Sequence, residues 1–196
     1  MICIGLTGIF GSGKSTVSRI FKKMNIPVIS CDAIVDKLLK KKEIKRQIAH
    51  TFGDEYLDKN GEIDRKKLAM LVFSFPRQRE SLNEIIHPQV FKMLGEKLDM
   101  HRKKGKMAVV VEIPLLFETR SEKLFDAIIT VASPLSVIKE RLKEKYSPEE
   151  IDMRIKSQMP LAKKIRLSDY VIDNSGTITQ MQFQVKKILQ DIMRRN

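Results

Sequence analysis

The sequence predicts an α/β protein built on a parallel five-stranded sheet with helices on both faces. Short apolar, β-branched runs alternate along the chain with segments whose apolar residues recur at helical spacing. Runs that are apolar throughout are typical of strands buried on both faces, as in parallel sheets. The chain has 196 residues, 42% of them hydrophobic and 31% charged, which is enough for one compact globular domain.

The first strand is predicted at residues 2–6, an apolar run that leads into a glycine-rich loop. The helix after this loop carries its apolar residues on one face, from Val17 to Met24. Pro27 ends the helix, and residues 27–29 form the second predicted strand. The glycine-rich loop is therefore expected between a strand and a helix.

Residues 8–15 match the pattern G-x-x-x-x-G-K-[ST] in full. The glycines keep side chains away, so that backbone N–H groups and the positive end of the next helix surround a phosphate. The Lys14 ammonium would reach the β- and γ-phosphates of a nucleotide, and the Ser15 hydroxyl would bind Mg²⁺. The predicted ATP-binding residues of this loop are Gly8, Gly11, Ser12, Gly13, Lys14, Ser15 and Thr16.

Residues 32–104 show helical patterns and no convincing strand. A helix is predicted from Asp32, and Asp64 fits the N-cap of a later helix. A longer helical stretch covers about 77–103, and Pro88 is expected to interrupt or restart it. We expect a helical lobe, about 32–104, inserted into an α/β core.

The remaining strands are predicted at residues 107–111, 127–131 and 170–172. Ser133, followed by a proline, is expected to cap one helix, and Ser147 with Glu150 forms a capping box for another. Residues 178–193 form the closing helix. The core would then consist of residues about 1–31, 105–135 and 168–196.

Among proteins with such a loop, a small kinase of a small molecule fits this chain best. Asp173-Asn174-Ser175-Gly176 matches the D-x-x-G of a GTPase formally, but it lies near the C-terminus and no guanine-reading N-K-x-D follows. A motor protein or a large ATPase would need a longer chain. A kinase also needs a group that orients the acceptor hydroxyl, an acid near Mg²⁺ and cations around the transferred phosphoryl group.

The cations are expected from residues 136–167, predicted as two helices joined by a short loop and rich in basic side chains. Such a segment is typical of a lid that closes and excludes water, so that the phosphoryl group goes to the substrate. Arg141 and Arg154 are the candidate phosphate contacts, because a planar guanidinium grips phosphate bidentately. A solvated helix face is the alternative for either residue.

Two acidic residues follow predicted strands at the carboxyl edge of the sheet, where ligands bind in such folds. Asp32 is the candidate for accepting or aligning the acceptor hydroxyl, and capping of its helix is the alternative. Glu112 ends the strand at 107–111, where a Walker-B carboxylate can hold Mg²⁺ directly or through water, and a capping role is equally open. The predicted catalytic residues are Asp32, Lys14 and Arg141.

The net charge of +13 attracts polyphosphate ligands or nucleic acid. Aromatic residues are few and Trp is absent, so a base-stacking nucleic-acid surface gains little support. The two cysteines, Cys3 and Cys31, indicate buried thiols in a reducing compartment rather than a metal site. No run approaches the length of a membrane span, and the first residues lack the basic region of a signal peptide.

We expect a cytoplasmic protein, either a monomer or a weak homo-oligomer, with a small-molecule substrate. Neither a nucleic acid nor a membrane is expected as its partner.

The motifs along nearly the whole chain resemble those of the dephospho-CoA kinase family. They are Gly5-Leu6-Thr7-Gly8 running into Gly11–Val17, Val28-Ile29 before Asp32, Gly61-Glu62-Ile63-Asp64-Arg65, Ile86-His87-Pro88, Pro114-Leu115-Leu116-Phe117-Glu118, Arg154 with Gln158, and Tyr170–Gly176. The glycine-rich loop alone would not separate this family from other small kinases. The His-Pro and Pro-Leu-Leu-Phe-Glu elements in this order are much more specific.

The resemblance implies phosphorylation of the ribose 3′-hydroxyl of dephospho-CoA by ATP with Mg²⁺, the last step to coenzyme A. It also implies a P-loop NTPase fold with a three-layer αβα core, a helical substrate lobe and a helical lid. Asp32 would be the acid–base residue, and Arg65, His87 and Arg154 would bind substrate, although His87 could equally be a buried structural histidine. Asn174 would lie beside the adenine of ATP.

Three positions depart from the family pattern: Ser30 stands where Asp is usual, Ile9 replaces a common Gly, and Glu112 stands where Asp is frequent. These departures concern the surroundings of Mg²⁺ and the shape of the loop. Three alternatives to the implied function are a kinase of another nucleotide or nucleoside, a noncatalytic nucleotide-binding regulator and an ATP-dependent nucleic-acid-binding protein.

Overall fold

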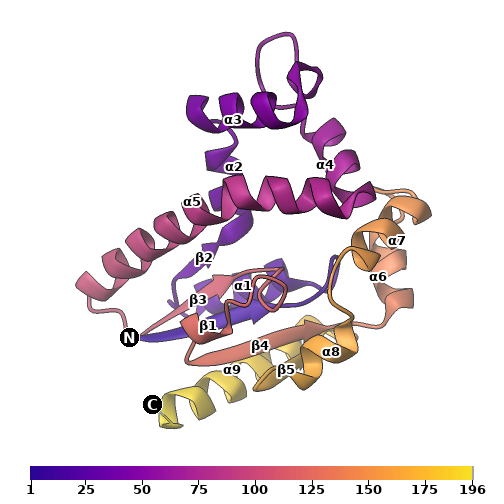
Figure 1. Ribbon diagram of the computed structural model, residues 1–196. Helices are drawn as coiled ribbons and strands as arrows, with labels where there is room; N and C mark the ends of the chain where they lie inside the picture. Colours follow the sequence, from indigo (N-terminus) through magenta and orange to yellow (C-terminus); the bar gives the residue numbers. More distant parts are fainter. Residues whose placement is uncertain (196) are drawn as a thin grey trace. The chain divides into compact units, whose positions relative to one another are not determined.

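The computed structural model describes residues 1–195 (Figure 1). Its centre is one five-stranded parallel sheet with the strand order β2-β3-β1-β4-β5. The strands are β1 (Ile2–Thr7), β2 (Val28–Ser30), β3 (Ala108–Glu112), β4 (Ala127–Ala132) and β5 (Tyr170–Asp173). The predicted fold class is confirmed, and each predicted strand agrees with an observed one to within about two residues.

The chain divides into two compact units. The core unit comprises residues 1–30 together with the chain from residue 98 onward, and the helical unit comprises residues 31–97. No helix among residues 1–195 is long and apolar enough to span a membrane. The functional division into nucleotide core, substrate lobe and lid stays a prediction.

One face of the sheet is covered by α1 (Lys14–Lys23) and α9 (Ile178–Arg195), which contact each other and, respectively, β3 and β5. Side chains from both helices and four strands form one buried apolar cluster, in which Phe21 and Val185 are fully enclosed. The one-sided apolar pattern of each helix matches this packing, because the polar face remains in solvent. The opposite face packs against the segment after β3, where Leu116 and Phe125 lie over Gly5 of β1.

Three short helices connect β4 to β5 in the core unit: α6 (Leu135–Leu142), α7 (Pro148–Lys156) and α8 (Leu161–Arg166). A 3₁₀ turn, η2 (Glu122–Leu124), precedes β4. The expectation of two helices after β4 is therefore wrong, because Pro160 starts a third helix. The capping box of α7 is confirmed, since Ser147 Oγ accepts from Glu150 N and Glu150 Oε2 accepts from Ser147 N.

The helical unit contains α2 (Cys31–Leu38), α3 (Lys42–Phe52), η1 (Asp54–Tyr56), α4 (Arg65–Ser74) and most of α5 (Pro76–Lys103). Asp64 caps α4 as expected, its Oδ1 accepting from Lys66 N and Lys67 N. The expected interruption at Pro88 is wrong, because α5 runs through it as one helix. A proline removes one helical hydrogen bond, and the rest of a long helix can hold the turn in place.

Candidate active site in a glycine-rich phosphate loop

The loop at residues 8–15 runs from the carboxyl end of β1 into α1. Gly8 and Gly13 have φ angles of +147° and +99°, in the region that side-chain-bearing residues rarely adopt. A Cβ on Gly13 would lie 1.9 Å from Asn174 Nδ2, and a Cβ on Gly8 would lie 2.5 Å from Val131 O. Both glycines are therefore required by conformation and by space, and the loop wraps as tightly as the motif predicts.

Lys14 is the first residue of α1, and its ammonium is turned back over the loop. Its Nζ donates to Gly8 O at 3.0 Å and to Ile9 O at 3.1 Å, and the residue is only 9% exposed. The positive charge thus stands beside the backbone amides that begin α1. An anion in the loop would meet both the ammonium and the helix dipole.

Ser12 supports the shape of the loop from within. Its N–H donates to Ile9 O, and its carbonyl accepts from the side-chain amide of Asn174 at 2.8 Å. Its hydroxyl is fully buried and has no hydrogen-bond partner among the described residues. A direct contact between Ser12 and ATP stays a prediction, as do the ATP contacts of Gly11 and Thr16.

Glu112, at the end of β3, is joined to α1 through Ser18. Ser18 Oγ donates to Glu112 Oε2 at 2.7 Å, and Ser18 is 5% exposed. Ser15 lies three residues before Ser18, so its hydroxyl emerges on the same side of the helix. Ser30, at the end of β2, is the register partner of Glu112 in the sheet.

Mg²⁺ fits this arrangement of oxygens. No cluster of three or more His, Cys, Asp or Glu side chains within residues 1–195 could hold a metal ion. Mg²⁺ does not need such a cage, because it keeps several waters and binds one or two protein oxygens together with substrate phosphates. The Ser15 hydroxyl and the carboxylate of Glu112 would supply oxygen ligands of the kind that a hard cation prefers.

Arg141, in α6, is held by residues that follow β4 and β5. Its Nη2 donates to Asn174 O at 2.9 Å, and its Nη1 donates to Ser133 Oγ at 3.4 Å. Asn174 is buried and its side chain contacts the phosphate loop, so it joins Arg141 to that loop. Ser133 does not cap α6 as expected, because its hydroxyl donates instead to Asn174 O.

Arg154, in α7, also lies beside the phosphate loop. Its Cζ is 5.1 Å from the centre of the Phe10 ring and 4.8 Å from the centre of the Tyr146 ring. Gln158, just beyond α7, accepts the Phe10 N–H at 2.8 Å. The segment after β4 therefore contacts the loop both through a ring and through a main-chain amide.

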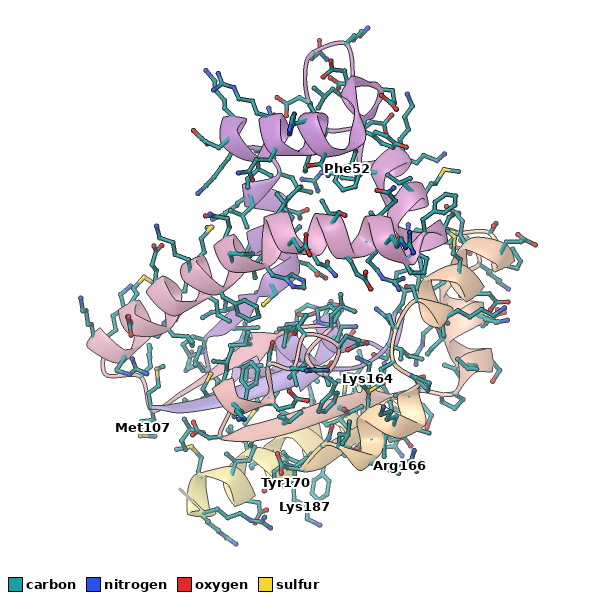
Figure 2. The ribbon with its side chains drawn as sticks, viewed as in Figure 1. Phe52, Met107, Lys164, Arg166, Tyr170 and Lys187 are labelled. Atoms are coloured by element: carbon teal, nitrogen blue, oxygen red, sulfur yellow. The ribbon has the colours of Figure 1, made fainter. Side chains whose placement is uncertain are left out.

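Lys164, in α8, is fully buried (labelled in Figure 2). Its Nζ donates to Glu118 Oε2 at 2.8 Å and to Pro114 O at 2.9 Å, and Glu118 Oε1 accepts from Met159 N. Burial lowers the pKa of the Lys164 ammonium, and the Glu118 carboxylate opposes that shift. This buried pair joins the Pro-Leu-Leu-Phe-Glu segment to α8.

The remaining candidate residues lie in the helical unit. Asp32 is exposed and is the second residue of α2, so it does not occupy the position before the helix where a capping side chain usually sits. Arg65, the first residue of α4, pairs with Asp36 through its Nη1 and donates from Nη2 to Asp36 O at 3.2 Å. Since Asp32 and Asp36 are four residues apart on one helix face, the Arg65 guanidinium lies one turn from Asp32.

His87 lies in α5 with its ring 6.2 Å from that of Phe91 in an edge-to-face arrangement. The side chain is partly buried, and this burial lowers the pKa of the imidazole below its ordinary value of 6.5. These contacts fit the structural alternative for His87, and its role in binding substrate stays a prediction.

Sequence reasoning missed the contacts of Ser18, Phe10 and Tyr146, and it did not single out Lys164. A signal existed for Ser18, which is spaced one helical turn from Ser15. No local pattern could pair Phe10 with a residue of α7, because their contact joins positions far apart in the chain.

Comparison with known proteins agrees with this geometry. A family model described as dephospho-CoA kinase matches residues 2–180. A protein named dephospho-CoA kinase from Bacillus cereus (strain ATCC 10987 / NRS 248) is 42% identical over 193 residues, covering 97% of this chain and 96% of its own.

Two solved structures resemble the chain over nearly its whole length. One, from Thermus thermophilus, has a TM-score of 0.82 and 34% identity, covering 97% of each chain. Another, a dephospho-CoA kinase from Campylobacter jejuni, has a TM-score of 0.70 and 28% identity, covering 99% of this chain and 98% of its own.

Proposed function

This chain belongs to the dephospho-CoA kinase family, and we propose that Lys14, Asp32 and Arg141 carry its phosphoryl transfer from ATP to the ribose 3′-hydroxyl of dephospho-CoA. The observation that supports this assignment best is the phosphate loop, with its positive-φ glycines and the Lys14 ammonium turned over it. ATP is the co-substrate of a kinase built on such a loop. The products are coenzyme A and ADP.

The reaction makes one bond and breaks one bond. The 3′-oxygen bonds to the γ-phosphorus of ATP, and the bond from that phosphorus to the β–γ bridging oxygen breaks, which releases ADP. The proton of the 3′-hydroxyl passes to Asp32 and then to solvent. Charge builds up on the bridging oxygen, where the Lys14 ammonium and the amides at the start of α1 would stabilise it.

The assignment of Asp32 rests on chain connectivity. Asp32 comes two residues after Ser30, which ends β2, and all five strands of the sheet are parallel. The phosphate loop begins at the end of β1, which lies at the same edge of the sheet as the end of β2. A carboxylate that follows β2 so closely is suited to a hydroxyl that attacks a phosphate held in the loop.

Arg141 would add positive charge on the other side of the loop. A guanidinium has five N–H donors, and Arg141 uses Nη1 and Nη2 to hold Ser133 and Asn174 while its side chain stays exposed. These two bonds hold the charge of Arg141 beside Asn174, whose side-chain amide donates to Ser12 O. Asn174 would help to bind the adenine of ATP, either by contacting it or by holding the phosphate loop in position.

Mg²⁺ would be held by Ser15 and, through water, by Glu112, and it supplies charge neutralisation for the phosphates when bound. Ser18 would keep the Glu112 carboxylate oriented by the hydrogen bond to Oε2. Arg65, His87 and Arg154 would contact dephospho-CoA, whose phosphates suit guanidinium groups. We further propose that the protein acts in the cytoplasm as a monomer or weak homo-oligomer, without nucleic-acid partners.

The test is a coupled assay of ADP release with Mg²⁺ and a panel of hydroxyl acceptors that includes dephospho-CoA, nucleosides and nucleotides. Among the acceptors, we expect only dephospho-CoA to raise ADP release well above the rate with ATP and no acceptor. ³¹P NMR of the product should show the new phosphate on the 3′-oxygen. ADP release with another acceptor, and none with dephospho-CoA, would reject the substrate assignment.

A further inference from the structure

Phe10 is an unusual side chain for its place in the chain, a large ring within a loop whose glycines keep side chains away from the phosphate. Two residues of the α7 segment contact it. Arg154 lies over its ring at 5.1 Å, and Gln158 accepts its N–H at 2.8 Å. Tyr146 completes the group, with its ring edge-on to that of Phe10 at a centre-to-centre distance of 5.3 Å and an interplanar angle of 76°.

We propose that Phe10 and Tyr146 are positioning residues that hold the Arg154 guanidinium beside the phosphate loop for the transfer reaction. This proposal rests on the proposed function, since it gives Arg154 a phosphate of ATP or dephospho-CoA to bind. We define the group of Phe10, Tyr146 and Arg154 as the aromatic clasp.

The aromatic clasp suits this role because of how a guanidinium binds its partners. Aromatic rings attract the guanidinium through its flat face, at distances below about 6 Å from the ring centre. This contact uses no N–H donor, and the N–H donors at the edges of a guanidinium are the groups that bind phosphate bidentately. Two rings at 4.8 and 5.1 Å from the same Cζ restrict the plane of the group more than one ring would.

The helix that carries Arg154 is fixed in register on the same side. The capping box of Ser147 and Glu150 sets where α7 begins, and the Lys139–Asp152 ion pair at 2.7 Å joins α7 to α6. Ser157 Oγ donates to Arg154 O at 2.8 Å, at the point where the helix ends. The side chain of Gln158 then accepts the main-chain N–H of Phe10. Residue 10 therefore contacts the segment after β4 through both its ring and its main chain.

A purely structural explanation is that the rings of Phe10 and Tyr146 form a small apolar contact that stabilises α7, to which Arg154 contributes nothing. That explanation predicts a loss of stability whenever either ring is removed, and it predicts no special dependence on Arg154. The positioning role predicts that the effect on turnover requires Arg154 to be present. The two explanations are therefore separable by combining variants.

The experiment compares Tyr146→Phe and Tyr146→Leu in the full-length protein, each alone and combined with Arg154→Ala. Tyr146→Phe keeps the ring, whereas Tyr146→Leu keeps apolar volume without a π face. We expect Tyr146→Leu to lower kcat by about 3- to 30-fold with little change in ATP affinity, and Tyr146→Phe to restore most of the rate. In the Arg154→Ala background we expect Tyr146→Leu to change kcat by less than about twofold.

Thermal unfolding of each variant controls for folding. An equal loss of kcat for Tyr146→Leu with and without Arg154, or unchanged kcat in the single variant, would overturn the positioning role. Should the acceptor panel identify a substrate other than dephospho-CoA, the proposed function fails, and the same four-variant comparison with that acceptor still decides the role of the aromatic clasp.

Discussion

Single side chains show that burial alone does not define the role of a lysine in this protein. Lys14 and Lys164 are both buried, but Lys14 is held by two loop carbonyls and Lys164 by a carboxylate and a carbonyl. The two carbonyls hold the ammonium of Lys14 over the phosphate loop, where its charge would face an incoming phosphate. The charge of Lys164 is balanced by Glu118, which makes it a structural group.

Asp32→Asn tests the catalytic role of the carboxylate after β2. The amide cannot accept the hydroxyl proton, so we expect kcat to fall by about 10²-fold or more, while ATP affinity changes little. The measurement is steady-state ADP release with dephospho-CoA, together with calorimetric titration of ATP. Unchanged kcat in Asp32→Asn would reduce Asp32 to a first-turn acid that favours the helix dipole.

Helices and loops derive their positions from a few side chains that connect distant segments. The Glu118–Lys164 pair connects the loop after β3 to α8, with Lys164 fully buried and the Glu118 side chain 21% exposed. Removing the acid leaves a buried ammonium without its counter-charge. Removing the lysine leaves a carboxylate that still reaches solvent.

We therefore expect Glu118→Ala to lower the free energy of unfolding by about 3–5 kcal/mol and Lys164→Met to lower it by less. Urea unfolding followed by circular dichroism measures both variants, and the order of the two losses is the decisive result. A larger loss for Lys164→Met would show that packing of the aliphatic stem, beside the Phe117 ring, dominates over the charge.

The helix α5 gives a pH-dependent prediction through His87. Burial lowers the pKa of His87 in the folded state below 6.5, so the unfolded chain binds a proton more readily. Well above pH 6.5, His87 is neutral in both states and does not change the free energy of unfolding. As the pH falls from 6.5 through the folded pKa, the unfolded chain takes up the proton first and the fold loses stability. We expect the difference in unfolding free energy between pH 7.5 and pH 5.5 to shrink in His87→Gln, as measured by urea unfolding at both pH values. An unaltered pH dependence would mean that the pKa of His87 is the same in the folded and the unfolded chain.

The whole molecule shows which parts of its structure are encoded locally. The strands, the phosphate loop and the Asp64 and Ser147 caps follow from periodicity and from short motifs, which act within a few residues. The contact between Asn174 and Ser12 joins residues 162 positions apart in the chain, and the contact between Arg154 and Phe10 joins residues nearly as far apart. Such contacts depend on how the finished sheet brings strand ends together, so no local pattern reveals them.

The same limit explains the wrong expectations. Ser133 has the residue type and spacing of a helix cap, but folding brings the Asn174 carbonyl within reach of its hydroxyl. Pro88 should break an isolated helix, yet Ile86 and Val90 on either side of it are buried. Burial of these neighbours stabilises the helix by more than one missing hydrogen bond costs.

The charge of the whole molecule leads to a last prediction. A net charge of +13 makes a field that attracts ATP and dephospho-CoA, both of which carry several negative charges. Salt screens this field over about 10 Å at 0.1 M, while contacts inside the phosphate loop are screened much less.

Raising NaCl from about 0.02 M to about 0.2 M should therefore lower kcat/KM for both substrates by several-fold and leave kcat nearly unchanged. Charge reversal at the exposed residues Lys103, the last of α5, and Lys104, which follows it, should weaken the salt dependence without altering kcat at saturating substrate. If kcat/KM does not change with salt, the basic surface serves another purpose than attracting substrate, and retention on nucleic acid at low salt would be the measurement to compare with it.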